Sequence, residues 1–588
     1  MSRQLIILII FFANQAIGQV PFLEEKRDFI WLTGYDDTFP PFGGTVINFN
    51  NDTVLVQYEY REMNFDVTNS SICSTEGELL FYTNGIYIAD QEGELMENGD
   101  SLNPDPYTLS WAENGLILPQ GALSIPKPNH PDIYYLFHES LSFEVIPDGP
   151  IAKPLYFYYS LIDMNENNGL GKVLEKNVPL IQDTLDLGKI TSSRHANGRD
   201  WWIIFGEFNK QSFYIFLLSP NGIEPYDHQL LPNADNYFSG LGQAVFTPDG
   251  TKYVRLNLHN LYTDQFIDIF DFDRCTGEFS NPIQITYIDT AYAGGVAISP
   301  NNQYLYVSSF KYIYQYDLEA NDIEASKQIV AILDGFQSES FGLYTTFFLA
   351  QLAPDNKIYI NANNSVEYMH IIHNPNAGGE DCQIEQHGLV LSTLNSFSMP
   401  NNPYFRLGPL DGSPCDTLGL DNHPKADFYH IVSDTLASFW DYSLFAPTEW
   451  KWDFGDGSEL SYEQNPQHIY AQSGIYEVCL TVSNDNASDT HCEWVEIIIT
   501  DTQVPDSPVK NPRLFPNPVG DYFYFSYHSD KTGSCTLYDA LGRAVLQRPL
   551  LSGNVTQAWD AHRLAAGVYY LMIEVEGQVV FSEKVMKL

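Results

Sequence analysis

The densest group of side chains that could do chemistry lies at residues 194–202, in the order Arg-His-Ala-Asn-Gly-Arg-Asp-Trp-Trp. A histidine that is oriented by an aspartate can act as a general base, which would give His195 and Asp200 a catalytic role. However, His195 stands where other repeats of the chain have a turn proline, and Asn-Gly is a favoured two-residue hairpin turn. We therefore interpret residues 195–200 as a turn between two strands.

Three histidines later in the chain are candidates for a metal site. His370 and His373 bracket two isoleucines, and His387 follows them. Strand residues three apart point to opposite faces of a sheet, whereas the ligands of a zinc ion must converge. We therefore expect no metal at these histidines.

Acidic side chains at two places are candidates for binding Ca²⁺. Asp268, Asp271 and Asp273 lie on a strand before a glycine, but they lack the full ladder of oxygen ligands that a Ca²⁺ loop has. Asp453 and Asp456 flank a glycine turn, where carboxylates commonly cap backbone N–H groups. We expect no metal site, and Ca²⁺ at this turn is the one cofactor that the pattern leaves open.

Short catalytic motifs are missing from the sequence. It contains no Gly-x-Ser-x-Gly elbow, no phosphate-binding loop, no His-Glu-x-x-His and no sialidase-type Ser-x-Asp-x-Gly-x-Thr-Trp box. We therefore assign no catalytic and no cofactor-binding residue, and we expect that the protein is not an enzyme.

Composition describes a folded, strongly acidic chain. Its 588 residues include 29 Lys and Arg against 75 Asp and Glu, so the net charge is −46. Aromatic residues make up 14%, which a disordered acidic chain would lack. A field of this sign repels phosphates, so we expect neither nucleic acid nor an anionic lipid surface as a partner.

The first 18 residues are typical of a secretory signal peptide. Arg3 precedes a nine-residue apolar run from Leu5 to Ala13, and Ala16-Ile17-Gly18 provides small residues before a cut at Gln19. No other run approaches the ~18 apolar residues of a membrane span, so we expect no transmembrane segment.

An internal repeat organises residues 19–410. Prolines 248, 300 and 354 each end a short strand of small and apolar residues, and an aromatic strand follows each Pro-Asp or Pro-Asn turn. Weaker copies begin near residues 71, 121 and 190. Aromatic strands at spacings of 52 and 54 residues predict a β-propeller, and the unit length favours seven blades.

Two further β units follow the propeller, which makes the fold class all-β. We place a linker at residues 411–425, a sandwich at 426–500, a second linker at 501–512 and a second sandwich at 513–588. We expect both sandwiches to be immunoglobulin-like.

The first sandwich resembles a PKD (polycystic kidney disease) domain. The resemblance rests on Trp452-Asp453-Phe454-Gly455-Asp456-Gly457 and on the alternating strand from Gly474 to Val482. It implies an immunoglobulin-like spacer or an adhesive, glycan-contacting module without catalytic activity.

The last 76 residues resemble the type A C-terminal sorting domain of type IX secretion in Bacteroidetes-like bacteria. The resemblance rests on residues from four separate segments: Pro516, Asn517, Pro518, Gly542, Arg543, Gly567, Tyr569 and Lys587. The resemblance implies that the type IX secretion machinery is a partner and that the protein is secreted or attached to the outer-membrane surface. The propeller is similar to uncharacterised propellers that often carry this tail, a similarity that implies no activity.

Seven cysteines lie in a chain that leaves the cytoplasm, so disulfides are permitted. If Asp485-Asn486 is a two-residue turn, Cys479 and Cys492 face each other across an antiparallel pair of strands, close enough to bridge. We expect Cys382 and Cys415, near the closure of the ring, to form a second disulfide.

Together these features predict a surface-displayed, non-catalytic binding or adhesion protein, with a glycan or a surface protein as the ligand of the propeller. One alternative is a glycan-active propeller hydrolase or lyase, for which a pair of carboxylates roughly 5–10 Å apart at the channel mouth would argue. Another is a purely structural envelope protein without a ligand pocket.

Overall fold

The structure is a computed structural model that describes residues 20–587, except residues 23, 37–38, 52, 147–148, 232–238, 259–263, 290–292, 500–508, 516–518, 520–521 and 540–541. The signal peptide lies outside the described residues. Residues up to Ile497 form one compact unit, and residues from Ile498 form a second.

Seven antiparallel sheets follow one another through the described part of residues 30–395. The strands, sheet by sheet, are β2 (Ile30–Gly34), β3 (Gly44–Asn48) and β4 (Leu55–Glu59); β5 (Ser70–Cys73), β6 (Leu79–Thr83) and β7 (Ile88–Asp90); β8 (Ala122–Pro126), β9 (Ile133–Ile146), β10 (Gly149–Asp163) and β11 (Lys172–Gln182); β12 (Thr191–Arg194), β13 (Trp201–Gly206), β14 (Ser212–Ser219) and β15 (Gly222–Leu230); β16 (Ala244–Phe246), β17 (Lys252–Asn257), β18 (Gln265–Phe272) and β19 (Phe279–Tyr287); β20 (Gly294–Ile298), β21 (Tyr304–Ser309), β22 (Tyr312–Asp317) and β23 (Gln328–Ile332); and β24 (Ala350–Leu352), β25 (Ile358–Ile360), β26 (Val366–Ile372) and β27 (Ile384–Asn395). The described helices are short: α1 (Pro106–Leu109) and three 3₁₀ turns at Asn167–Gly169, Glu324–Ser326 and Gly379–Cys382.

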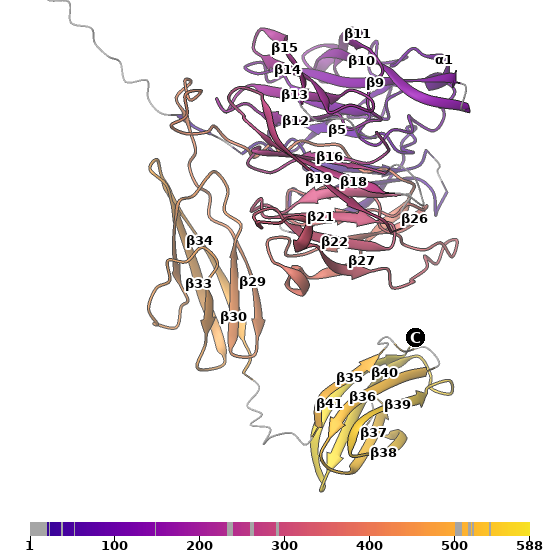
Figure 1. The fold of residues 1–588 in the computed structure, drawn as a ribbon, viewed down its shortest axis with the longest axis vertical. Helices are drawn as coiled ribbons and strands as arrows, with labels where there is room; N and C mark the ends of the chain where they lie inside the picture. The colour runs from indigo at the N-terminus through magenta and orange to yellow at the C-terminus, as the bar shows by residue number, and fades with distance from the viewer. Residues whose placement is uncertain are drawn as a thin grey trace, which may run out of the picture. The chain divides into compact units, whose positions relative to one another are not determined.

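The sheets are the blades of a β-propeller. Their first strands are neighbours, β5 beside β2 and β8, and β16 beside β12 and β20; β5, β12 and β16 lie toward the middle of the propeller in Figure 1. β27 contacts β2, β3 and β4, and the hydroxyls of Thr45 and Thr393 are 2.8 Å apart, so the last sheet closes onto the first. The predicted all-β propeller is confirmed. In the three clearest repeats, the strands before and after prolines 248, 300 and 354 are the first and second strands of a blade, as predicted.

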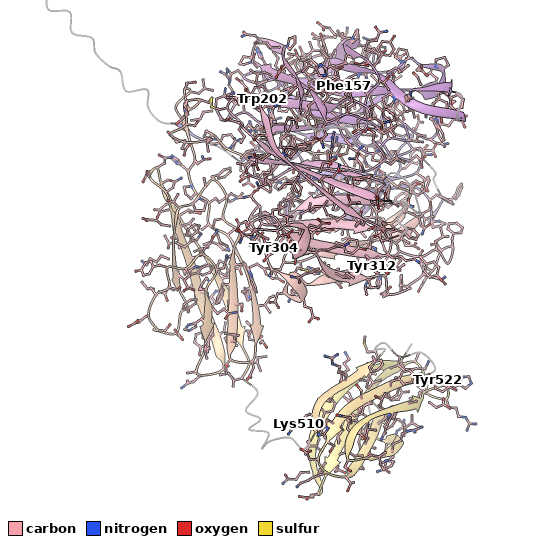
Figure 2. The ribbon with its side chains drawn as sticks, in the orientation of Figure 1. Phe157, Trp202, Tyr304, Tyr312, Lys510 and Tyr522 are labelled. Atoms are coloured by element: carbon pink, nitrogen blue, oxygen red, sulfur yellow. A yellow bond between two sulfur atoms is a disulfide. The ribbon has the colours of Figure 1, made fainter. Side chains whose placement is uncertain are left out.

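Aromatic side chains fill the spaces between blades because each sheet presents alternate residues to its neighbour. Phe157 of β10 stacks on Phe205 of β13, with ring centroids 4.6 Å apart, and Trp202 of β13 packs edge-on against Phe272 of β18. Figure 2 labels Phe157 and Trp202 among the closely packed side chains of this part. This packing joins the faces of neighbouring blades.

The central channel is walled by amide and small side chains, as innermost strands require. The side-chain carbonyl of Gln243 accepts hydrogen bonds from the backbone N–H groups of Val296 (3.2 Å) and Ala350 (2.9 Å), which links three first strands. A Cβ atom at Gly295 would lie 2.1 Å from the Gln243 Oε1 atom, so this position needs glycine.

The chain itself occupies this channel after β27. Asn401 donates hydrogen bonds to the carbonyls of Ala122 (2.9 Å) and Ile190 (3.0 Å), and Arg194 donates to the carbonyl of Phe405. The cavity that remains between the walls and residues 402–407 is about 50 Å³, room for one or two water molecules.

The predicted linker after the propeller is folded against it. β28 (Leu420–Asp421) pairs in parallel with β1 (Val20–Pro21). The first sandwich follows, with one sheet of β29 (Phe428–Ser433), β30 (Leu436–Asp441) and β32 (Gln467–Ile469) and a second of β31 (Glu449–Asp453), β33 (Gly474–Ser483) and β34 (Ser488–Ile497).

The second compact unit is another two-sheet sandwich, in which Figure 2 labels Lys510 and Tyr522. One sheet contains β35 (Val509–Phe515), β36 (Tyr522–Ser529) and β39 (Gly553–Asp560), and the other β37 (Gly533–Asp539), β38 (Ala544–Leu550), β40 (Gly567–Val575) and β41 (Gln578–Lys587). β35 begins inside the predicted linker because Val509 pairs with Ser529 and is buried in the core of this sandwich. Among the residues that the structure describes, no helix has the length and apolar character needed to cross a bilayer.

Candidate functional site

A pocket of about 390 Å³ lies on the face of the propeller that carries the turns between first and second strands. Five charged side chains line it: Glu25, Arg27, Lys127, Arg194 and Arg199; we call it the arginine pocket. Phe22, Trp201 and prolines 126, 128 and 131 add apolar wall. Counting histidine as neutral, the lining carries four positive charges and one negative charge.

The charged side chains of the arginine pocket come from three distant segments. Glu25 and Arg27 precede β2, Lys127 stands in the turn after β8, and Arg194 ends β12. The β8–β9 turn is closed by hydrogen bonds from the His130 N–H to the Lys127 carbonyl (3.0 Å) and from the Lys127 N–H to the Ile133 carbonyl (2.8 Å). The blades therefore hold these side chains around one opening.

Glu25 lies between two arginines at the base of the pocket. Its Oε2 atom is 2.6 Å from Nε of Arg27 and 3.8 Å from an Nη atom of Arg194. Burial acts to raise the pKa of Glu25, but the charges of Arg194 and Arg27 outweigh it and lower the pKa. Glu25 is therefore held as a carboxylate that orders the two guanidinium groups.

Arg194 has unused hydrogen-bonding capacity. Its side chain is 4% exposed, its guanidinium lies 4.2 Å from the Trp201 ring centroid, and its buried Nε–H has no hydrogen-bond partner among the residues that the structure describes. Arg199, in contrast, pairs with Asp200 at 2.7 and 3.0 Å. Chemically, this arrangement is suited to binding a small anionic group.

Residues 195–200 form the predicted turn. The His195 N–H donates to the Asp200 carbonyl (2.8 Å), and Gly198 has a φ of +75°. His195 Nδ1 accepts a hydrogen bond from the Asn197 N–H, and Asp200 accepts from Asn197 and Arg199, so these groups serve the turn. Sequence reasoning missed the arginine pocket here because Arg27 and Lys127 are remote in the chain; the scarcity of basic residues was the only available signal.

Two of the three candidate histidines are neighbours: the His387 N–H donates a hydrogen bond to His370 Nδ1 (3.1 Å), and the two ring centroids are 6.2 Å apart. His370 is fully buried and burial lowers its pKa to about 3, whereas His373 pairs with Glu385 at 2.8 Å at the surface. His387 stacks on Phe336 and lies 3.4 Å from Asp334. No group of metal-ligating side chains among the described residues includes them.

The three aspartates of the acidic strand form hydrogen bonds and ion pairs within the propeller. Asp268 is fully buried, accepts hydrogen bonds from Arg255, Asn257 and Gln284, and is part of a charged cluster between blades. Asp271 pairs with Lys252 at 2.5 Å, and Asp273 accepts from the Cys275 N–H in the following turn.

The glycine turn of the first sandwich uses its carboxylates as caps. Asp453 accepts from the Gly455 N–H (3.0 Å), and Asp456 accepts from the Ser458 N–H (3.0 Å). Burial opposes ionisation of Asp456, but hydrogen bonds from Ser458 and His468 outweigh it and lower its pKa to about 2. Trp452 and Phe454 are buried, and Gly455 and Gly457 have φ values of +76° and +79°.

One predicted disulfide is present and the other is wrong. Cys479 pairs with Cys492 across β33 and β34, in the predicted register, with Cα atoms 4.1 Å apart. Cys415, however, is bonded to Cys275, and Cys382 is a buried free thiol. After it leaves the channel, the chain passes the β18–β19 turn, where Arg274 donates a hydrogen bond to the Gly408 carbonyl (2.5 Å). This path brings Cys415 next to Cys275.

The sorting-domain residues occupy turns and strand ends. Residues 516–518 lie outside the described residues. Gly542 (φ +75°) and Arg543 form a turn closed on Asp539, and Arg543 is 74% exposed. Gly567 begins β40 opposite Lys587 of β41, and the buried Tyr569 donates its hydroxyl to the Ala565 carbonyl.

Comparison with known proteins identifies both sandwiches. Residues 434–499 match the family model of the PKD domain, and residues 513–587 match that of the secretion system C-terminal sorting domain. The first sandwich is similar to the PKD1 domain of the Vibrio cholerae metalloprotease PrtV, at 32% identity over 13% of this chain and 96% of that chain, with a TM-score of 0.12.

Two further solved structures are similar to longer parts of the chain. A Lactobacillus plantarum protein is 10% identical over 63% of this chain and 98% of that chain, with a TM-score of 0.36. A putative TolB from Agrobacterium tumefaciens is 15% identical over 46% of this chain and 86% of that chain, with a TM-score of 0.23. With the propeller given by its own sheets, the two family matches show that the chain is a β-propeller protein that contains a PKD domain, followed in the sequence by a C-terminal sorting domain of type IX secretion, which marks it for export to the cell surface or beyond.

Proposed function

We propose that this protein is a non-catalytic binding protein of the cell surface, and that its propeller binds a glycan through an acidic sugar in the arginine pocket. The observation that carries the proposal is a positive pocket of about 390 Å³ on a chain with a net charge of −46. Lys127 and Arg199 are the half-buried positive side chains of this lining, within reach of a ligand in the pocket.

The surrounding negative charge restricts the ligand. Charges separated by more than ~8 Å are largely screened at physiological salt, so the pocket arginines dominate only at close range. A polyanion would meet the acidic surface along its whole length, whereas an isolated carboxylate meets only the pocket. Pro128, Pro131 and the other apolar wall residues offer flat surfaces to the ring that carries this carboxylate.

The enzyme alternative has less support. The channel, where a propeller enzyme would place its carboxylates, holds residues 402–407 and a cavity of only about 50 Å³. Asp28 on its wall is paired with Arg406 at 2.8 and 3.0 Å, so both of its carboxylate oxygens already accept hydrogen bonds from the guanidinium.

A glycan array screened with the full mature protein tests the proposal, followed by calorimetric titration of any glycan that binds. We expect glycans with single terminal acidic sugars to bind. Lys127→Gln combined with Arg199→Gln should weaken binding about tenfold or more, since charge-assisted contacts contribute ~1.5–3 kcal/mol. The matched control Lys311→Gln, at an exposed turn of another blade, should leave affinity unchanged. Exclusive binding of neutral glycans, equal loss in the control, or cleavage of the bound glycan would contradict the proposal.

A further inference from the structure

Three aspartates converge in the segment that joins the propeller to the PKD domain. Asp411, Asp416 and Asp421 are spaced five residues apart, and one carboxylate oxygen from each lies within 4.8 Å of the others. We call residues 411–422 the aspartate loop. Oxygens that share one Ca²⁺ ion at 2.3–2.6 Å are at most ~4.6–5.2 Å apart, so this convergence fits a single ion.

Amide groups satisfy these carboxylates only in part. Asp416 accepts from the Gly412 N–H (3.0 Å), and Asp411 accepts from the Asn422 N–H (3.2 Å) and the Asn486 side chain (2.9 Å). Asp421 is 7% exposed, and its buried Oδ2 atom accepts no hydrogen bond from any residue in the described part of the chain. A buried carboxylate oxygen without a partner, beside two like charges, is costly unless a cation completes the site.

The aspartate loop is held rigidly from three sides. The Cys275–Cys415 disulfide ties it to the β18–β19 turn of the propeller. β28 pairs with β1, and the Phe22 N–H donates to the Asp421 carbonyl (2.9 Å). On the PKD side, the Asn422 carbonyl accepts from Asn484 (2.9 Å) and Asn486 (3.2 Å) of the β33–β34 turn. The carboxylates are therefore positioned before any ion binds.

We propose that Asp411, Asp416 and Asp421 bind one Ca²⁺ ion, which locks the propeller to the PKD domain. Carboxylate oxygens are the ligands that Ca²⁺ prefers, whereas zinc favours cysteine and histidine, and Mg²⁺ demands near-octahedral geometry. Extracellular Ca²⁺ modules bind with dissociation constants of ~10⁻⁴–10⁻³ M, and we expect this range here. The proposal does not depend on the arginine pocket.

Calcium titration of the chelator-stripped full mature chain tests it, by calorimetry and by thermal unfolding. We expect one site, a Ca²⁺-dependent rise in the unfolding temperature, and much weaker binding of Mg²⁺. Asp416→Asn and Asp421→Asn should each reduce Ca²⁺ affinity about tenfold or more. The matched control Glu459→Gln removes one exposed charge from the PKD domain and should change nothing.

The effect of Asp416→Asn on stability distinguishes a metal site from a merely structural loop, because only a metal site makes this effect change sign when Ca²⁺ is added. Without Ca²⁺, Asp416→Asn should be as stable as the parent or more stable, because it relieves repulsion; with Ca²⁺, it should be less stable. Absence of Ca²⁺ binding up to ~10 mM would overturn the proposal. So would Ca²⁺ binding that survives in Asp416→Asn and Asp421→Asn but is lost when Asp453 and Asp456 are both changed to Asn, which would place the ion at the PKD turn.

Discussion

The ion pair between Arg406 and Asp28 joins the end of the propeller to its beginning. Two hydrogen bonds of 2.8 and 3.0 Å connect the guanidinium to the carboxylate, and the two side chains are only 1% and 3% exposed. Changing Arg406→Met would leave the Asp28 carboxylate buried without its cation. The substitution Asp28→Asn would likewise leave the Arg406 guanidinium buried without its carboxylate.

Removal of one partner from a buried ion pair typically costs ~3–5 kcal/mol, and we expect the upper part of this range for Arg406→Met. Both N–H···O contacts are lost, together with the packing of the guanidinium on the Tyr404 ring, 4.9 Å away. The double variant Asp28→Asn/Arg406→Met removes both charges, so its cost should be ~2 kcal/mol or less, well below the sum of the two single costs.

Hydrogen exchange in low denaturant, read by mass spectrometry on peptides from the first strands of the blades, measures this opening free energy without interference from the two sandwiches. Lys311→Met, at an exposed turn, is the control. A cost below ~1 kcal/mol for Arg406→Met, or a double variant as unstable as the sum of the singles, would refute the idea that this buried pair stabilises the propeller.

Three further predictions concern acid, redox state and export. Burial lowers the pKa of His138 and of His370 to about 3, whereas a histidine of the unfolded chain titrates near ~6.5, so the unfolded state binds protons first as the pH falls. The free energy of unfolding of the propeller, measured by urea denaturation, should therefore fall by ~2 kcal/mol per histidine between pH 7 and 5. His138→Gln should halve this loss. Replacing Cys479 and Cys492 by alanine should lower the free energy of unfolding of the PKD domain by ~3 kcal/mol in thermal scans, and an unchanged transition would show that the bridge does not constrain the unfolded chain. Deleting residues 513–588 should leave a folded protein in the periplasm on cell fractionation, since this segment matches a sorting domain; its appearance at the surface would contradict the export role.

Local sequence patterns determined much of the fold. The Asn-Gly turn at residues 197–198, the Cys479–Cys492 register and the Trp-Asp-Phe-Gly-Asp-Gly turn all involve residues within about 15 positions of one another. Backbone sterics, the two-residue period of strands and turn preferences act over such distances, so these features can be read directly. The blade repeat is the same local signal, used several times.

Contacts between remote segments depended on the closed ring. Cys275 and Cys415 are 140 residues apart, and Arg406 and Asp28 are 378 apart. No local pattern shows that residues after β27 enter the channel, because this path depends on how many sheets the ring holds and on the width that they leave. The arginine pocket and the aspartate loop likewise form only where the closed ring brings separate turns and the linker together. The sequence alone therefore determined the architecture and the export address, while the tertiary structure decided which side chains meet, because their convergence is set by ring closure and not by neighbouring residues.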